Sequence, residues 1–272
     1  MKISELLEQK DKLPNVPAVV KELIQSLSDE NADYDQIAAK VAKDPTLSVK
    51  ILRMVNSAYY GLSRQVNSID EAVVMVGFDR LKTLVISSGL TGSVEADVDG
   101  LDMRRFWNES FEVGEICKII AARSSSVDEN VAFTAGIISN IGRLLLHLTT
   151  PMRAKAIQTL VDEGGDRCKA ESDRLHFTTP QAGAALLEMW KLPQELCVAV
   201  LQQREPLSHE EPSALSAVLR LAKQMMHARK DGRSEKELSD AISLPLLALA
   251  GIDGGLGELI HQVSEMESVN IM

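Results

Sequence analysis

Cysteine is scarce in this chain, and its few cysteines form no pattern. There are three in 272 residues, an odd count, and no two of them stand in Cys-x-x-Cys spacing. A disulfide framework needs paired cysteines, and a structural zinc site needs closely spaced ligand pairs. The sequence therefore argues against both a disulfide-linked scaffold and a zinc knuckle.

Basic residues are also in short supply. Lys and Arg together number 29 and Asp and Glu number 39, so the formal net charge is −10. Non-specific binding to nucleic acid or to an anionic membrane needs clustered cations. The charge balance therefore predicts a protein with no nucleic-acid partner and no membrane partner.

Long hydrophobic runs are missing as well. The longest apolar stretch, Leu244 to Ile252, contains Pro245 and is far too short to span a bilayer. The first ten residues carry charges throughout and have no apolar signal core. These features predict a cytoplasmic protein.

Several motifs of nucleotide binding and catalysis are absent. The chain contains no Gly-x-Gly-x-x-Gly loop, no Gly-x-x-x-x-Gly-Lys-Ser/Thr loop and no Gly-x-Ser-x-Gly elbow. Its five histidines show neither His-x-x-x-His nor His-Asp spacing. We interpret them as surface or structural residues.

Helical signals dominate what is present. Asp33–Gln36 and Ser68–Glu71 are typical capping boxes, Asp44-Pro45 is typical of a helix start, and Gly77 is a plausible helix stop. Apolar spacing predicts further helices over residues 78–90, 103–123, 131–148, 151–162, 181–190, 194–203 and 213–229. No segment alternates as a strand would. The sequence therefore predicts an all-α protein of twelve to fifteen helices.

A polar, acidic and glycine-containing segment, residues 91–100, interrupts this helical pattern. We interpret it as a linker between two packed helical parts. The predicted division is an N-terminal part over 1–93, a linker over 94–102 and a C-terminal part over 103–272.

Ordered motifs in both parts carry a resemblance to a known family. In the first part they are Leu13-Pro14-x-x-Pro17, Asp44-Pro45-Thr-Leu47, Lys50-Ile-Leu52, Asn56-Ser57-Ala58-Tyr59-Tyr60, Ser68-Ile69, Ala72 and Gly77. In the second they are Phe106-Trp107, the run from Ala135 to Arg143, Gly183 to Leu186, Trp190 to Pro193, and the helix through Ala222. Over about residues 10–230 the chain resembles the HDOD family, and the last forty residues carry little of this pattern.

The resemblance implies an HD-like helical fold and a role in bacterial signal transduction. HDOD domains are relatives of the HD and HD-GYP metal-dependent phosphohydrolases, and they are often fused to cyclic di-GMP enzymes or receiver domains. The surrounding motifs also locate the positions at which the catalytic relatives hold their metal ions with histidine and aspartate. In this chain those positions are occupied by Glu109, Ser139, Asn140, Thr179, Gln202, Gln203 and Lys223.

This set of residues is poorly suited to a metal ion. A divalent ion needs imidazoles and carboxylates around it and an open position for water. Serine, threonine and glutamine are weak neutral ligands, and the Lys223 ammonium would repel a cation. Only Glu109 remains a good ligand. The sequence therefore predicts no catalytic residue, no bound metal and no cofactor.

The segment Asn56, Ser57 and Tyr60 allows two interpretations. Its polar groups could satisfy backbone atoms at a helix end, or it could line a groove between the two parts and contact a partner. The lost metal site likewise could be a filled core, which we favour. It could instead be a polar pocket, lined by Glu109, Asn140, Thr179 and Gln203, that takes a small ligand.

These observations predict a non-catalytic bacterial signal-transduction module that acts by contact with an unidentified signalling protein. Two alternatives remain open. One is a divergent metal-dependent phosphohydrolase. The other is a sensor that binds a nucleotide or cyclic dinucleotide without hydrolysing it, since a helix N-terminus can receive a phosphate.

Overall fold

The fold is all-α. The computed structural model describes residues 1–14, 16–25, 34–57, 60–91 and 98–266, and within these ranges it contains helices and no strand. The α-helices are α1 (Ile3–Leu7), α2 (Ala18–Gln25), α3 (Tyr34–Ala42), α4 (Pro45–Val55), α5 (Ile69–Val76), α6 (Phe78–Thr91), α7 (Met103–Ala121), α8 (Glu129–Ile138), α9 (Ile141–Thr149), α10 (Pro151–Asp162), α11 (Arg167–Leu175), α12 (Thr179–Met189), α13 (Gln194–Gln202), α14 (Ala214–Lys230), α15 (Glu235–Ala241), α16 (Leu244–Leu249) and α17 (Leu256–Ser264). Two short 3-10 helices, η1 (Lys10–Lys12) and η3 (Pro206–Ser208), join them.

Local sequence signals set several of the helix ends. The Asp44 carboxylate accepts a hydrogen bond from the Leu47 backbone N–H at 3.0 Å, with Pro45 in the first turn of α4. The Ser68 hydroxyl accepts one from the Glu71 N–H at 3.1 Å, at the start of α5. Gly77 ends α5 with a φ of 82°, which glycine adopts without strain. The predicted capping box at Asp33–Gln36 begins outside the described residues.

The predicted helix over 131–148 is wrong in one respect, because it is two helices. Helix α8 ends at Ile138 and α9 begins at Ile141, and Asn140 between them has a non-helical backbone (φ −104°, ψ 8°). Apolar spacing continues across the break, so periodicity alone could not locate it. The described residues form seventeen α-helices rather than twelve to fifteen, because of this break and of short helices near both ends of the chain.

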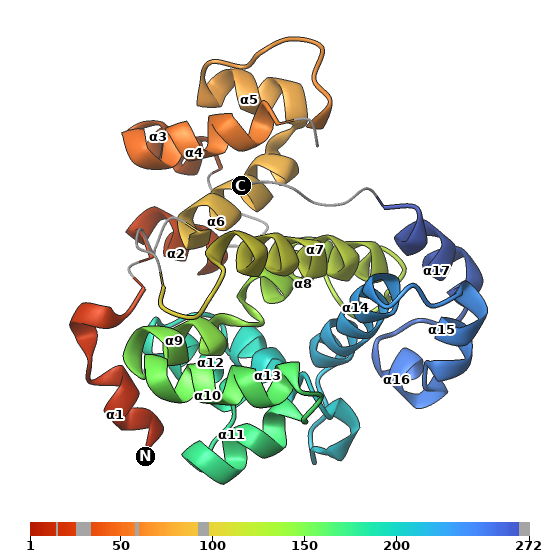
Figure 1. Ribbon diagram of the computed structural model, residues 1–272. Helices are drawn as coiled ribbons and strands as arrows, with labels where there is room; N and C mark the ends of the chain where they lie inside the picture. Colours follow the sequence, from red (N-terminus) through yellow and green to blue (C-terminus); the bar gives the residue numbers. More distant parts are fainter. Residues whose placement is uncertain (15, 26–33, 58–59, 92–97, 267–272) are drawn as a thin grey trace.

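Helices α7 and α8 form the centre of the molecule (Figure 1). Helix α14 packs on both, α9 to α13 gather on one side, and α6 connects α8 to the N-terminal helices α2 to α5. Aromatic side chains fill this centre: the rings of Phe111 and Phe133 meet edge to face at 5.5 Å, and Trp107 is buried. The N-terminal helices thus reach the rest of the fold through α6 and through α2, whose Gln25 donates to the Lys191 carbonyl at 2.9 Å.

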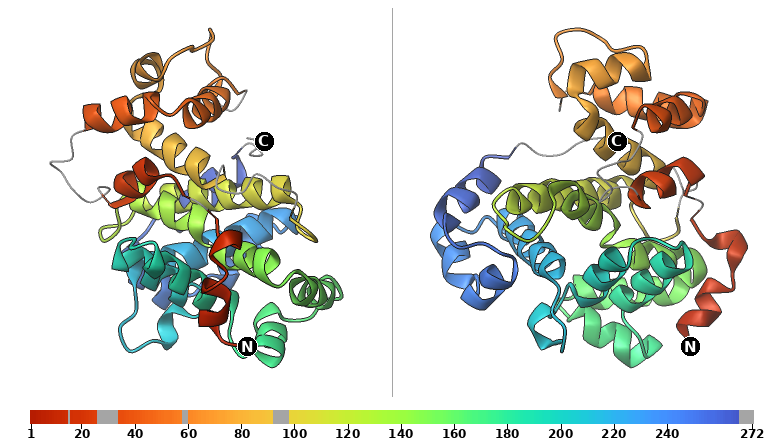
Figure 2. Two further views of the ribbon diagram at one scale, coloured as in Figure 1. Left: turned by 90° about the vertical axis from the view of Figure 1, so that its left-hand side faces the viewer. Right: turned by 180° about the vertical axis from the view of Figure 1, so that it is seen from behind.

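The first helix departs from the predicted division at residue 93. Helix α1 packs against α9 and α12, which belong to the C-terminal part (Figure 2). Its Leu6 is fully buried there. Helix α1 therefore lies with the C-terminal helices although it precedes residue 93, because burial of an apolar side chain, and not position along the chain, decides where a helix packs. Residues 94–97 of the predicted linker lie outside the described residues.

One segment is long and apolar enough to cross a membrane by length and composition. It is Glu129–Thr149, and 83% of its most apolar window is buried inside the fold. This segment comprises α8, the break and α9, and its apolar side chains pack in the core.

Candidate functional site

The break between α8 and α9 lies beside a buried lysine. The Lys223 ammonium on α14 donates to the Asn140 side-chain oxygen Oδ1 at 2.8 Å and to the Gln203 oxygen Oε1 at 2.5 Å. Gln203, just after α13, donates in turn to the Ser139 carbonyl at 3.0 Å. Three separate elements thus meet at one point, which we call the Lys223 cluster (Ser139, Asn140, Gln203 and Lys223).

Burial governs the electrostatics of this cluster. Removal from water, with repulsion from nearby arginines, lowers the pKa of Lys223 to about 7. The two amide oxygens accept hydrogen bonds from the lysine nitrogen and carry no formal charge. The Ser139 hydroxyl is buried without a hydrogen-bond partner. A lysine nitrogen and two side-chain amides therefore lie where the resemblance implies metal ligands, and the four residues of the cluster include neither an imidazole nor a carboxylate.

The three remaining predicted positions have other partners. Thr179 gives its backbone N–H and its hydroxyl to the buried Glu171 carboxylate, at 2.7 and 3.0 Å. Gln202 donates to the Glu211 carbonyl at 2.9 Å and so fixes the loop before α14. Glu109 belongs to a different set of contacts, described next. The structure therefore joins four of the seven predicted positions and separates the others.

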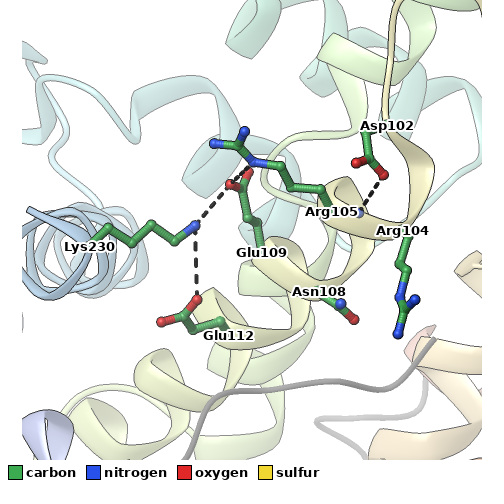
Figure 3. Close-up of a pocket in the computed structure, with 7 residues that line it drawn as sticks. All are labelled: Asp102, Arg104, Arg105, Asn108, Glu109, Glu112 and Lys230. Atoms are coloured by element: carbon green, nitrogen blue, oxygen red, sulfur yellow. Dashed lines mark hydrogen bonds and ion pairs between the residues drawn. The ribbon is translucent and has the colours of Figure 1, made fainter.

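Glu109 lies in an open, charged hollow of about 390 Å³ (Figure 3). Its carboxylate accepts from Arg105 at 3.0 Å and from Lys230 at 2.9 Å. Burial opposes the charged form of Glu109, but these two hydrogen bonds outweigh it and hold the pKa of that carboxyl below its usual range. The lining residues are Asp102, Arg104, Arg105, Asn108, Glu109, Glu112 and Lys230. Three cations and three carboxylates balance there.

The segment after α4 contains both a structural and a groove-lining residue. The Asn56 side chain donates to the Val66 carbonyl and accepts from the Val66 N–H, both at 2.8 Å, and so closes the intervening loop. The Ser57 hydroxyl is buried without a hydrogen-bond partner. Tyr60 lines a second hollow, about 390 Å³ in volume. Ala58 and Tyr59 lie outside the described residues.

This second hollow, which we call the Tyr60 groove, runs between the two helical parts. Its lining residues are Tyr60, Arg80 and Thr83 from the N-terminal part, and Glu115, Lys118, Ile119, Ala122, Glu129 and Gln262 from α7, the residue after it, α8 and α17. Burial, and then the Glu115 carboxylate, raise the pKa of the Tyr60 hydroxyl above its ordinary value. Tyr60 therefore stays protonated and can donate a hydrogen bond.

Sequence reasoning missed a group of arginines beside the Lys223 cluster. Arg143 and Arg167 both donate to the side-chain oxygen of Gln158, at 3.3 and 2.5 Å. Arg204 directly follows Gln203, and Arg220 lies three residues before Lys223 on α14. These arginines stand far apart in the sequence, with no shared spacing to signal their meeting. Among the residues with described positions, no three His, Cys, Asp or Glu side chains group where they could hold a metal ion.

Comparison with known proteins places the chain in a family. The model of the HDOD domain matches residues 13–206, so the chain belongs to the HDOD family. An uncharacterised protein of Treponema pallidum is 23% identical over 70% of this chain, and the cyclic di-GMP phosphodiesterase CdgJ of Vibrio cholerae is 25% identical over 52%. The matched regions span only 37% and 32% of those two curated relatives.

Solved structures support the same fold. A protein of Shewanella amazonensis SB2B, which carries the provisional name phosphohydrolase, is 33% identical with a TM-score of 0.80. The alignment covers 98% of this chain and 95% of that one. An HDOD domain protein of unknown function from Geobacter sulfurreducens has a TM-score of 0.83 at 20% identity, with 96% and 93% covered.

Proposed function

We propose that this chain is a non-catalytic signal-transduction module that acts by contact with another protein. The observation that carries the proposal is the Lys223 nitrogen, held by Asn140 and Gln203 at positions that the family resemblance matches to the metal ligands of HD hydrolases. In its protonated form the Lys223 nitrogen would repel a divalent ion a few ångströms away. Neutral amides in place of imidazole and carboxylate remove the ligands that such an ion prefers.

The rival proposal is a divergent metal-dependent phosphohydrolase. It draws support from the provisional name of the Shewanella amazonensis protein and from the name of the Vibrio cholerae relative. It requires metal ligands other than those that the family resemblance locates. The two proposals therefore differ in metal content and in hydrolysis.

Elemental analysis separates the two proposals. We expect protein purified without chelator, and then equilibrated with Mn, Fe(II) and Zn, to carry no stoichiometric metal. We also expect no hydrolysis of bis(p-nitrophenyl) phosphate above a chelator-treated control, because no metal-bound water is available as a nucleophile. A stoichiometric metal, or hydrolysis that chelation abolishes, would overturn the non-catalytic proposal in favour of the phosphohydrolase.

The Tyr60 groove is the surface that we propose for the partner contact. It joins both helical parts, so a partner bound there would sense their relative position. It also offers a protonated hydroxyl, charges of both signs and apolar side chains within one hollow. Such a mixture suits a polypeptide segment better than a single small ion.

Site-directed photocrosslinking in cells tests this surface. A photoreactive phenylalanine derivative at the exposed Arg80 is expected to give a discrete adduct, whereas the same group at exposed Lys236 on α15 gives none. Tyr60→Ala, in protein with an unchanged melting temperature, is expected to weaken the Arg80 adduct several-fold. Adducts of equal yield from both positions, or an Arg80 adduct whose yield Tyr60→Ala does not change, would show that the Tyr60 groove is not the contact surface.

A further inference from the structure

The arginines beside the Lys223 cluster converge without matching acceptors. The Arg143 and Arg167 guanidinium groups share one neutral oxygen, Gln158 Oε1, at 3.3 and 2.5 Å. The Arg143 Nε atom is buried and has no hydrogen-bond partner. Two like charges that share an uncharged acceptor leave donor capacity and positive potential unused.

Two further arginines extend this group. Arg204 pairs with the Asp166 carboxylate at 3.1 Å, and Asp166 is the residue before Arg167. Arg220 forms no hydrogen bond or ion pair within the described part of the chain, and it lies one helical turn before Lys223. We call Arg143, Arg167, Arg204 and Arg220 the arginine cluster. Its members come from α9, α11, the residues after α13, and α14.

Most of the carboxylates near these arginines are already engaged by other groups. Glu171 lies 3.8 Å from Arg167 but is committed to Thr179, Asp166 pairs with Arg204, and Asp162 accepts from Gln158. Two further carboxylates act on these arginines: Glu205 lies near Arg220, and Glu109, which acts on Arg143, is already held by Arg105 and Lys230. Burial lowers the pKa of Arg143, and repulsion from the neighbouring Arg167 lowers it further.

We propose that the arginine cluster binds a phosphoryl group. Guanidinium groups bind phosphate oxygens through paired N–H donors, and donors arriving from four elements suit a tetrahedral dianion better than a planar carboxylate. The cluster is open to such a ligand, since 22% of the Arg167 side chain and 38% of the Arg204 side chain are exposed. The proposal goes beyond the proposed function and holds whether or not the chain acts on a partner protein.

Calorimetric titration with inorganic phosphate and pyrophosphate tests the proposal. We expect both to bind the full-length protein at constant ionic strength, while acetate and chloride at the same ionic strength do not. Arg204→Gln and Arg167→Gln are each expected to weaken binding about tenfold or more, since each removes a charge-assisted hydrogen bond. The matched control is Arg174→Gln, at an exposed arginine on the same α11 helix.

The titrations either support or overturn phosphate binding by the arginine cluster. Phosphate binding that falls in both cluster variants and persists in Arg174→Gln supports the site. No binding, equal binding by acetate, or unchanged affinity in both cluster variants of normal melting temperature overturns it. None of these results depends on metal content, so the proposal can fail without the proposed function failing.

Discussion

Replacement of Gly142 by alanine is expected to destabilise the fold by about 3 kcal/mol, the upper range for an overpacked core. A Cβ atom on residue 142 would lie 2.0 Å from the Thr179 carbonyl oxygen and 2.7 Å from the Gly183 nitrogen. Both atoms belong to the backbone of α12, so neither can swing aside as a flexible side chain could. The first turn of α9 would have to move away from α12. Urea unfolding measures the loss.

A second glycine provides the matched control. Gly257 lies within α17, and a Cβ there would meet nothing within 4 Å. Gly257→Ala is therefore expected to raise the free energy of unfolding by about 0.5–1 kcal/mol, because alanine favours a helix over glycine. A Gly142→Ala protein as stable as wild type would show that α9 and α12 are not in this close contact.

The second large effect concerns Lys223 and pH. The pKa of Lys223 is lowered from 10.5 to about 7 in the fold. Below pH 7 both states are protonated, and the fold bears the whole cost of a buried ammonium. Above pH 7 the folded protein releases this proton while the unfolded chain retains it, so the contribution of Lys223 to stability rises with pH. The rise is at most about 1.4 kcal/mol per pH unit, and it continues to about pH 10.

Lys223→Met removes this dependence while it keeps an unbranched side chain of similar length. We expect the free energy of unfolding of wild type minus that of Lys223→Met to grow between pH 7 and pH 9. Urea unfolding at both values measures it. Lys236→Met, at an exposed lysine, is the control and is expected to leave the pH dependence of wild type unchanged. A difference that stays constant from pH 7 to pH 9 would show that Lys223 titrates as an exposed lysine does.

The Lys223 cluster also explains the main error in the predicted helices. Apolar residues continue from α8 into α9, so the sequence predicts one helix. Asn140 interrupts it, and its side chain binds an ammonium 83 residues further along the chain. That hydrogen bond forms only when α14 packs on α8, so the local sequence does not reveal it. A local pattern therefore could not predict the break, although the family resemblance did mark Ser139 and Asn140 as special positions.

Packing also decides which of the predicted site residues meet. The resemblance placed Glu109 and Thr179 with Asn140 and Gln203 in one pocket, but the structure pairs Glu109 with Lys230 and Thr179 with Glu171. In each case the partner is a charged residue to which the motifs gave no role. Ion pairs and hydrogen bonds form with whichever groups packing brings near, and side-chain identity alone does not name them.

The sequence by itself determined the helical class, the helix starts at Asp44 and Ser68, the stop at Gly77 and the family. These features depend on contacts within a few residues or on the order of motifs along the chain. Tertiary structure alone decided that α1 packs on α9 and α12, that Asn140 and Gln203 hold Lys223, and that four distant arginines gather beside them. The physical reason is the distance along the chain over which each interaction acts, since capping and apolar periodicity involve residues within one or two helical turns. The charge and hydrogen-bond partners of a buried group depend on which helices pack together.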